Sequence, residues 1–469
     1  MNATATRNES CAVSRGRRRT AGALSVLLAL LVSATALAAP TVTTLDNGLQ
    51  VCLAEDNSTD LVAVALLVEA TADCEPDAKV GLRAVLQQAI RGGLNERAQA
   101  GPDLAFLLDA QDGGGELSAD CDWEYVTLGY LGAADSLPAA LPALAAAMFQ
   151  PELTEAQFTA ARDAVLAAVS GPASAPAEST IALFRLALLG RPSRAYPLGT
   201  PETVGSLSLA DLNAFHRRFY APARATLAVV GPIDLPQTRQ LAARCFGSLP
   251  AGDRTLPDPP DMASAPQVRV AENAELTPGD HRHADIASLV VGVPAPGLGD
   301  PDQAVSYVAH ALLGGETATE GRVGQDDRLW ETLGLPFSRA DAQSRKFVES
   351  LAPPLSRRSH LAIHAYAAPR QSEAVKEALR DQLQRLATDP PGDKELQAAK
   401  QYVEGHLSAL YDRPANRALL MARACLLGQA DLTGDALTRQ VLGVTPQDVQ
   451  RVAKAWFAQP SVALELPQP

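Results

Sequence analysis

The fold is decided by a stretch near the middle of the chain. It reads Ser208-Leu209-Ala210-Asp211-Leu212-Asn213-Ala214-Phe215-His216-Arg217-Arg218-Phe219-Tyr220-Ala221-Pro222 and leads into the apolar segment 225–230. A hydroxyl followed three residues later by an acid satisfies free amide donors at the start of a helix. The stretch therefore predicts a helix that ends before a proline and is followed by a strand.

The same design recurs near the end of the chain. Thr445 and Asp448 supply the hydroxyl and the acid, an aromatic pair ends the helix, and residues 462–466 read as a strand. Two such units at matched positions predict a duplicated α+β domain. The alternative is that two unrelated helices converged on one common cap.

A proline-rich segment, residues 251–266, reads as an exposed linker. It divides the chain after residue 38 into two nearly equal halves, 39–250 and 267–469. We expect each half to be one copy of the duplicated domain.

The first half alternates apolar strands with helical patterns. Apolar runs predict strands at 43–55, 61–70 and 123–131, and helical spacing predicts helices at 80–90, 139–149 and 155–169. Gly92-Gly93 is expected to stop the first helix. Pro142 is expected only in the first turn of the second helix.

Composition excludes several classes of protein. With 469 residues, 47% hydrophobic and 20% charged, the chain has ample core material. Its 40 basic and 53 acidic residues give a net charge of −13. This charge argues against nucleic acid or an anionic membrane as a partner and favours a neutral or basic one.

Residues 1–38 have the three parts of a secretory signal peptide. Basic residues precede an apolar run from Ala21 that ends in Ala36-Leu37-Ala38. We therefore expect a periplasmic or secreted protein with no membrane attachment after cleavage. An uncleaved membrane anchor is the alternative.

The common catalytic motifs are missing. The sequence contains no Gly-x-Ser-x-Gly, no phosphate-binding loop, no Gly-x-Gly-x-x-Gly, no His-Glu-x-x-His and no Cys-x-x-Cys. Two histidine pairs, His281 with His283 and His360 with His364, are each spaced to share a strand face. Neither pair has a nearby third ligand for zinc, so we expect packed or solvated histidines.

The order of short motifs nevertheless resembles a known family. The motifs are Asn47-Gly48-Leu49, Glu75-Pro76, Gly81-Leu82, Gly115-Glu116-Leu117-Ser118-Ala119, Gly199-Thr200-Pro201-Glu202, Phe219-Tyr220-Ala221-Pro222, Val229-Val230-Gly231, Leu312-Leu313-Gly314-Gly315 and Val444-Thr445-Pro446-Gln447-Asp448. Together they resemble the insulinase/pitrilysin-type peptidases, the inverted zincins. The resemblance implies two homologous α/β-roll domains that form a clamshell.

The family's zinc motif, His-x-x-Glu-His, is degenerate here. The resemblance places Ala84 and Gln88 at the two histidines, Gln87 at the general-base glutamate, and Ala168 or its neighbour Ala167 at the third ligand. Zinc needs about three N, S or carboxylate donors, and an amide cannot take a proton from water. We therefore expect no zinc and no catalysis.

Other site residues follow from the same resemblance. Trp330 and Phe337 stand where the family has a substrate-contacting arginine and tyrosine. Together with Gln87 and Gln88 they are the candidate peptide-binding residues. The segments that hold Cys74 and Cys121 lie near each other in the family, so the resemblance implies a disulfide between them.

The resemblance implies a non-catalytic subunit that pairs with an active sibling, or with itself, around extended peptides. A stand-alone peptide-binding or scaffold protein is the second hypothesis. An active metallopeptidase that uses one of the two histidine pairs is the third.

Overall fold

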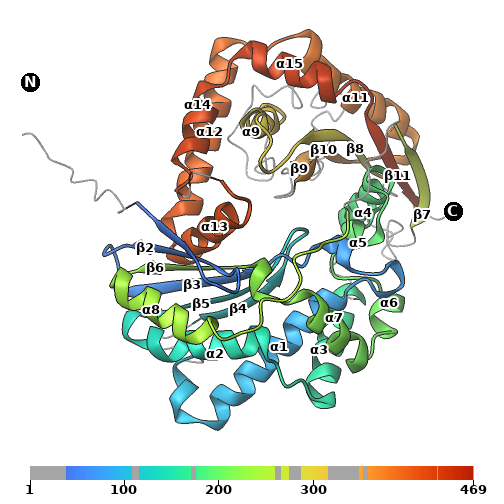
Figure 1. Ribbon diagram of the computed structural model, residues 1–469. Helices are drawn as coiled ribbons and strands as arrows, with labels where there is room; N and C mark the ends of the chain where they lie inside the picture. The colour runs from blue at the N-terminus through green and yellow to red at the C-terminus, as the bar shows by residue number, and fades with distance from the viewer. Residues whose placement is uncertain are drawn as a thin grey trace, which may run out of the picture. The chain divides into compact units, whose positions relative to one another are not determined.

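The computed structural model describes residues 39–107, 116–170, 176–258, 266–273, 287–314, 348–351, 357–429, 431 and 433–467. These residues form an α+β fold with two mixed sheets (Figure 1). In this part of the chain, no helix combines the length and the apolar character that crossing a membrane requires.

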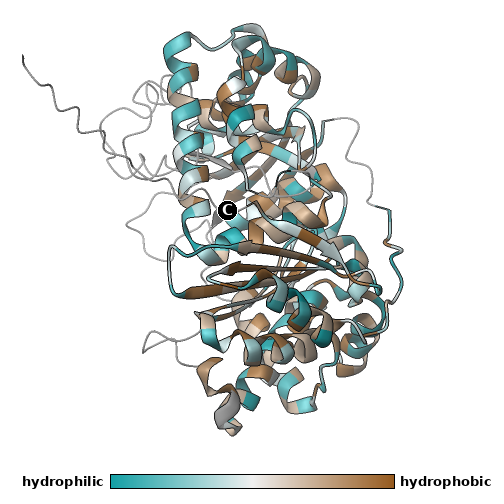
Figure 2. Cartoon of the chain, turned by 60° about the vertical axis from the view of Figure 1, so that its left-hand side comes forward, coloured by the Kyte–Doolittle hydropathy of each residue, from teal (hydrophilic) through white to brown (hydrophobic). Residues whose placement is uncertain are grey.

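The first sheet has six strands in the order β1-β2-β6-β3-β5-β4. They are β1 (Thr41–Thr44), β2 (Gln50–Glu55), β3 (Leu61–Val68), β4 (Glu116–Cys121), β5 (Val126–Ala133) and β6 (Ala225–Gly231). β2 and β6 are parallel, and the other neighbours are antiparallel. The central strands β3 and β6 are buried on both faces, which explains why nearly all of their residues are apolar. Figure 2 shows the strands of the fold as mainly hydrophobic.

Helices from the first half cover one face of this sheet with a large apolar core. The helices of this half are α1 (Leu82–Ala100), α2 (Leu137–Phe149), α3 (Glu155–Ser170), α4 (Pro176–Leu189), α5 (Pro192–Ala195), α6 (Pro201–Gly205), α7 (Leu209–Phe219) and α8 (Leu235–Phe246). All of them except α4 and α5 contribute buried apolar residues to that core, and α6 contributes a single residue, Val204.

The second sheet has the order β7-β11-β8-β10-β9. Its strands are β7 (Val268–Asn273), β8 (Ala287–Pro296), β9 (Val348–Leu351), β10 (Arg358–Ala367) and β11 (Ser461–Pro467). β7 and β11 are parallel and the remaining neighbours antiparallel. This pattern of order and direction is the same as that of β2-β6-β3-β5-β4 in the first sheet.

The second half has its own apolar core beside this sheet. Its described helices are α9 (Gln303–Leu312), α11 (Ser372–Thr388), α12 (Asp393–Asp412), α13 (Pro414–Leu426), α14 (Asp435–Gly443) and α15 (Pro446–Trp456). The helices that carry the core residues are α9, α11, α12, α14 and α15.

One helix from each half packs on the other half's sheet. α13 lies against β3 and β6 of the first sheet, and α4 lies against β8 and β11 of the second (Figure 1). Alanines on the first sheet, among them Ala63, Ala65 and Ala228, leave room for α13 to approach closely. The two halves are therefore joined through buried apolar surface.

The sequence-based elements are confirmed in type, with two corrections. The hydroxyl–acid capping boxes at Ser208 and Thr445 both form. However, α1 does not stop at Gly92-Gly93, because residues beyond the glycines are buried against α2 and α3 and outweigh a propensity cost of about 1 kcal/mol per glycine. Pro142 lies inside α2 rather than in its first turn.

Candidate functional site

The stretch predicted to be a degenerate zinc motif lies at the start of α1. Gly81 precedes the helix with φ +95°, a left-handed conformation that glycine adopts readily. A Cβ at this position would lie 2.5 Å from the Leu198 carbonyl oxygen. The turn therefore needs glycine, and it directs α1 into the core of the first half.

The three motif positions on α1 offer no metal-binding set. Ala84 is buried and has no donor atom, Gln87 is only 1% exposed, and Gln88 is half-buried. Neither Nε2 nor Oε1 of Gln87 has a hydrogen-bond partner among the described residues. A buried neutral amide without partners is neither a zinc ligand of the usual kind nor a general base.

The residues assigned to the third ligand lie on the exposed side of their helix and not on the side that packs into the core. Ala168 and Ala167 are both exposed on α3. The side of α3 that enters the core carries Phe158, Ala161 and Val165, which also lack donors. Neither the assigned alanines nor the buried side of α3 supplies a metal ligand, and the Asp163 carboxylate on this helix is 60% exposed.

A buried ion pair accompanies the motif, and the sequence analysis did not single it out. Arg83 Nε lies 3.3 Å from Glu75 Oε2, and both side chains are 0% exposed. Glu75 Oε1 also accepts the backbone N–H of Arg83, while Arg83 donates to the carbonyls of Ala70 and Asp122. Burial raises the pKa of Glu75 even though Arg83 opposes this shift. The pair joins the start of α1 to the loop before it.

The predicted disulfide between Cys74 and Cys121 is wrong for this structure, in which both are free thiols. Cys74 Sγ instead lies 3.6 Å from Thr71 Oγ1. Burial raises the pKa of both thiols, that of Cys121 to about 11. Each is an apolar filler with a protonated sulfur.

The histidine pairs do not form a metal centre in the described part of the chain. His360 is buried beside Trp123 and Phe184, and neither ring nitrogen has a partner among the described residues. His364 Nε2 lies 3.0 Å from Ser288 Oγ. His281, His283, Trp330 and Phe337 lie outside the described residues.

Zinc therefore does not fit the residues that the structure describes. Within the described ranges, no three histidine, cysteine or carboxylate side chains come together as a ligand set. The motif positions hold an alanine and two amides in place of such donors.

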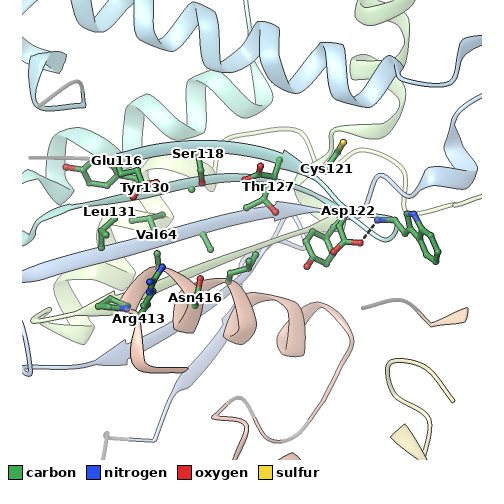
Figure 3. Close-up of a pocket in the computed structure, with 18 of the residues that line it drawn as sticks. Val64, Glu116, Ser118, Cys121, Asp122, Thr127, Tyr130, Leu131, Arg413 and Asn416 are labelled. Atoms are coloured by element: carbon green, nitrogen blue, oxygen red, sulfur yellow. Dashed lines mark hydrogen bonds between the residues drawn. The ribbon is translucent and has the colours of Figure 1, made fainter. Parts of the chain in front are cut away.

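A groove of about 830 Å³ runs along the other face of the first sheet (Figure 3). Figure 3 shows Ser118 and Thr127 on the strands along one side and Arg413 and Asn416 beside α13 on the other. Trp123 also lines the groove.

β4 forms the rim of this groove and is the outermost strand of its sheet among the described residues. Its side chains alternate: Glu116, Ser118 and Asp120 line the groove, whereas Leu117 and Ala119 pack into the core. An outermost strand presents backbone N–H and C=O groups on its free side. The groove thus combines an acidic rim with a strand edge.

Charged side chains are fixed near Trp123. Arg194 makes two hydrogen bonds to Asp73, of 2.6 and 3.0 Å, and lies 3.4 Å from Glu124. The guanidinium carbon of Arg185 lies 5.2 Å from the Trp123 ring centre. The sequence contained only a weak signal for this network. Its members are far apart in the chain, with 121 residues between Asp73 and Arg194, and they follow no regular spacing.

Residues 206–403 match the family model described as "Peptidase M16 inactive domain". An uncharacterized zinc protease of Mycobacterium tuberculosis is 27% identical over 75% of this chain and 76% of its own length. Human cytochrome b-c1 complex subunit 1, mitochondrial, is 25% identical over 60% of this chain and 56% of its own length.

Two solved structures have the same fold. A protease from Helicobacter pylori has a TM-score of 0.73 and 20% identity, covering 92% of this chain and 99% of its own. The peptidase M16 inactive domain from Pseudomonas fluorescens has a TM-score of 0.73 and 18% identity, covering 92% and 98%. Residues 206–403 thus match the peptidase M16 inactive domain in sequence, and the chain as a whole shares its fold with the two solved structures.

Proposed function

We propose that this chain binds extended peptides in the groove beside β4 and does not hydrolyse them. The observation that carries the proposal is a groove whose rim, β4, is the outermost strand of its sheet among the described residues. The predicted motif positions on the neighbouring helix α1 carry no metal donors. A peptide that adds as a strand gains backbone hydrogen bonds whatever its sequence.

The alternation along β4 specifies the peptide class. Glu116 and Asp120 are on the groove side, four residues apart, with Ser118 between them. A strand added beside β4 would place basic side chains at matching alternate positions, where each opposite-charge pair contributes about 0.2–1 kcal/mol. The net charge of −13 adds a long-range preference for such peptides.

The lack of hydrolysis rests on the motif positions. Without donors at 84, 87 and 88, the site has no group to hold a metal-bound water and none to deprotonate it. The name zinc protease belongs to relatives such as the one from Mycobacterium tuberculosis. In this chain, the proposal is that the same fold binds peptides without cleaving them.

We further propose that the chain is the non-catalytic subunit of a heterodimer with an active sibling, or of a homodimer. Its two halves would be homologous α/β-roll domains that close like a clamshell, as the matching strand orders support. The human relative is named as a subunit of a larger complex, which supports assembly with other chains. The N-terminal sequence supports a periplasmic or secreted location.

Peptide binding is tested by fluorescence anisotropy with labelled ten-residue peptides carrying lysine or glutamate at positions i and i+4. The lysine peptide should bind, and the double variant Glu116→Lys, Asp120→Lys should weaken it roughly tenfold, because two favourable pairs become repulsive. Glu404→Lys, an exposed acid on α12, is the control and should change binding less than twofold. Equal affinity for both peptides would refute the charge preference, and no binding would refute the proposal.

Catalytic status and partnership need separate measurements. Elemental analysis of the purified protein should find far less than one zinc per chain, and stoichiometric zinc with peptide hydrolysis would overturn the inactive assignment. A pull-down of the tagged chain from its native source should recover a similar-sized chain with His-x-x-Glu-His. Recovery of this chain alone would favour the homodimer or a stand-alone binding protein.

A further inference from the structure

A cation without a counter-ion lines one end of the groove. Arg185 of α4 and Trp123, in the turn between β4 and β5, both belong to the lining. Figure 3 shows Cys121 and Asp122 at one end of the groove and Glu116 at the other. Because Trp123 directly follows Asp122, the ring and the arginine over it lie at the end of the groove where β4 finishes.

Stacking, rather than an ion pair, positions the guanidinium of Arg185. Its carbon lies 5.2 Å from the centre of the Trp123 ring, and its Nε is buried without a hydrogen-bond partner. Within the described ranges, no carboxylate forms an ion pair with Arg185. Burial lowers the pKa of Arg185, and the exposed Glu178, two turns earlier on α4, opposes this shift. A cation partly removed from water and left unpaired is stabilised when an anion reaches it.

The other ionisable groups against Trp123 do not offer such a charge. The guanidinium carbon of Arg194 lies 5.8 Å from the ring centre, but two buried carboxylates already hold this side chain. His360 packs beside the ring, and burial, together with the charge of Arg185, holds its pKa well below 6.5. Of the two arginines that stack on Trp123 in the described part of the chain, Arg185 is the one without a carboxylate.

We propose that Arg185 binds a carboxylate group of the peptide in the groove, an inference that rests on the peptide binding proposed above. A guanidinium can donate two parallel hydrogen bonds to one carboxylate, and stacking on an indole fixes its plane in advance. Trp123 is three residues after Asp120. The carboxylate should therefore lie about three residues beyond the basic side chain that pairs with Asp120.

Two parts of a peptide can supply this carboxylate. The C-terminal carboxylate reaches Arg185 when the peptide runs parallel to β4, because β4 finishes at this end of the groove. An acidic side chain reaches it in either direction. The first source would make the groove selective for peptides with a free C-terminus, and the second would also admit internal segments of longer chains.

The test compares three N-acetylated peptides of eleven residues by titration calorimetry. All three carry lysine at positions 4 and 8, so that each end is three residues from a lysine. The first ends in a free carboxylate, the second in an amide, and the third in an amide with glutamate at positions 1 and 11. Wild-type protein should bind the first, the third or both at least about tenfold more tightly than the second. A gain for the first alone identifies the C-terminal carboxylate, and a gain for the third identifies an acidic side chain.

Variants of Arg185 assign the preference to this side chain. Arg185→Gln should bring the affinities for acid and amide peptides within about twofold of each other. Arg185→Lys keeps the charge but lacks the planar fork, so it should reduce the preference at least about threefold and serves if the glutamine variant does not fold. Arg91→Gln is the matched control, at a half-buried arginine of α1 on the opposite side of the first sheet, and should retain the full preference.

The outcomes separate this inference from the function on which it rests. Equal affinity of the wild-type protein for all three peptides would overturn the carboxylate site and leave peptide binding intact. A preference for the acid that persists in Arg185→Gln would place the carboxylate elsewhere and would also overturn it. Failure of all three peptides to bind would refute the proposed function, and the carboxylate site with it.

Discussion

Gln87 should limit the stability of the first half, and removing its amide should raise that stability. The side chain is 1% exposed, and both amide atoms lack a hydrogen-bond partner among the described residues. Burying a polar group without a partner costs about 1–3 kcal/mol. Gln87→Met keeps the unbranched shape and removes both polar atoms, so it should lower the free energy of the folded state by about that amount.

The assay is thermal unfolding followed by calorimetry. With an unfolding entropy of about 2.1 cal/mol/K per residue and a unit of about 200 residues, a gain of 1–3 kcal/mol corresponds to a rise in Tm of roughly 2–7 °C. Gln88→Met is the matched control, since Gln88 is only half-buried and should shift Tm by less than about 1 °C.

A second variant at this position tests the sign of the effect. Gln87→Glu buries a carboxyl one helical turn after Arg83. We expect burial to raise the pKa of this carboxyl, as it does for Glu75, whose pKa is raised although Arg83 opposes the shift. The unfolded chain then loses its proton first, so stability is highest below the unfolded pKa of about 4.3 and falls as pH rises. A destabilised Gln87→Met protein would refute the reasoning, because it would mean that a polar partner holds the amide.

Three further changes test other parts of the fold. His360→Phe should flatten the loss of Tm between pH 7 and pH 5, because burial holds the pKa of His360 well below 6.5 and only the unfolded chain takes up the proton; an unchanged slope would contradict this. Arg417→Ala should lower the free energy of unfolding by about 2 kcal/mol in urea titrations, since it breaks the 2.7 Å ion pair with Asp56; a change within error would mean that the pair is solvated. Gly81→Ala should cost more than about 1 kcal/mol in the same titrations, because φ is +95° and the new Cβ would meet the Leu198 carbonyl, and wild-type stability would show that the turn adapts.

Local patterns predicted much of the fold. The capping boxes, the apolar runs of β3 and β6 and the periodic helices were readable because each depends on residues within one or two turns of each other. The same patterns erred at Gly92-Gly93 and at Pro142, where tertiary burial outweighed local preference.

The candidate site was only partly predictable. The sequence shows by residue type that Ala84, Gln87 and Gln88 offer no usual zinc ligand, whereas their place in the family's motif stays a prediction. The orphaned amide of Gln87 and the ion pair of Arg83 with Glu75 were not, because burial and pairing depend on what packs around α1. The cysteine pairing was predicted wrongly for the same reason.

By itself, the sequence determined that the chain is an α+β protein in which two capped helices each lead into a strand, because caps and apolar periods are local properties. Only the tertiary structure decided that α4 and α13 each pack on the other half's sheet and that the acidic side of β4 faces a groove. These contacts join residues far apart in sequence, and chain spacing carries no information about which distant surfaces bury each other.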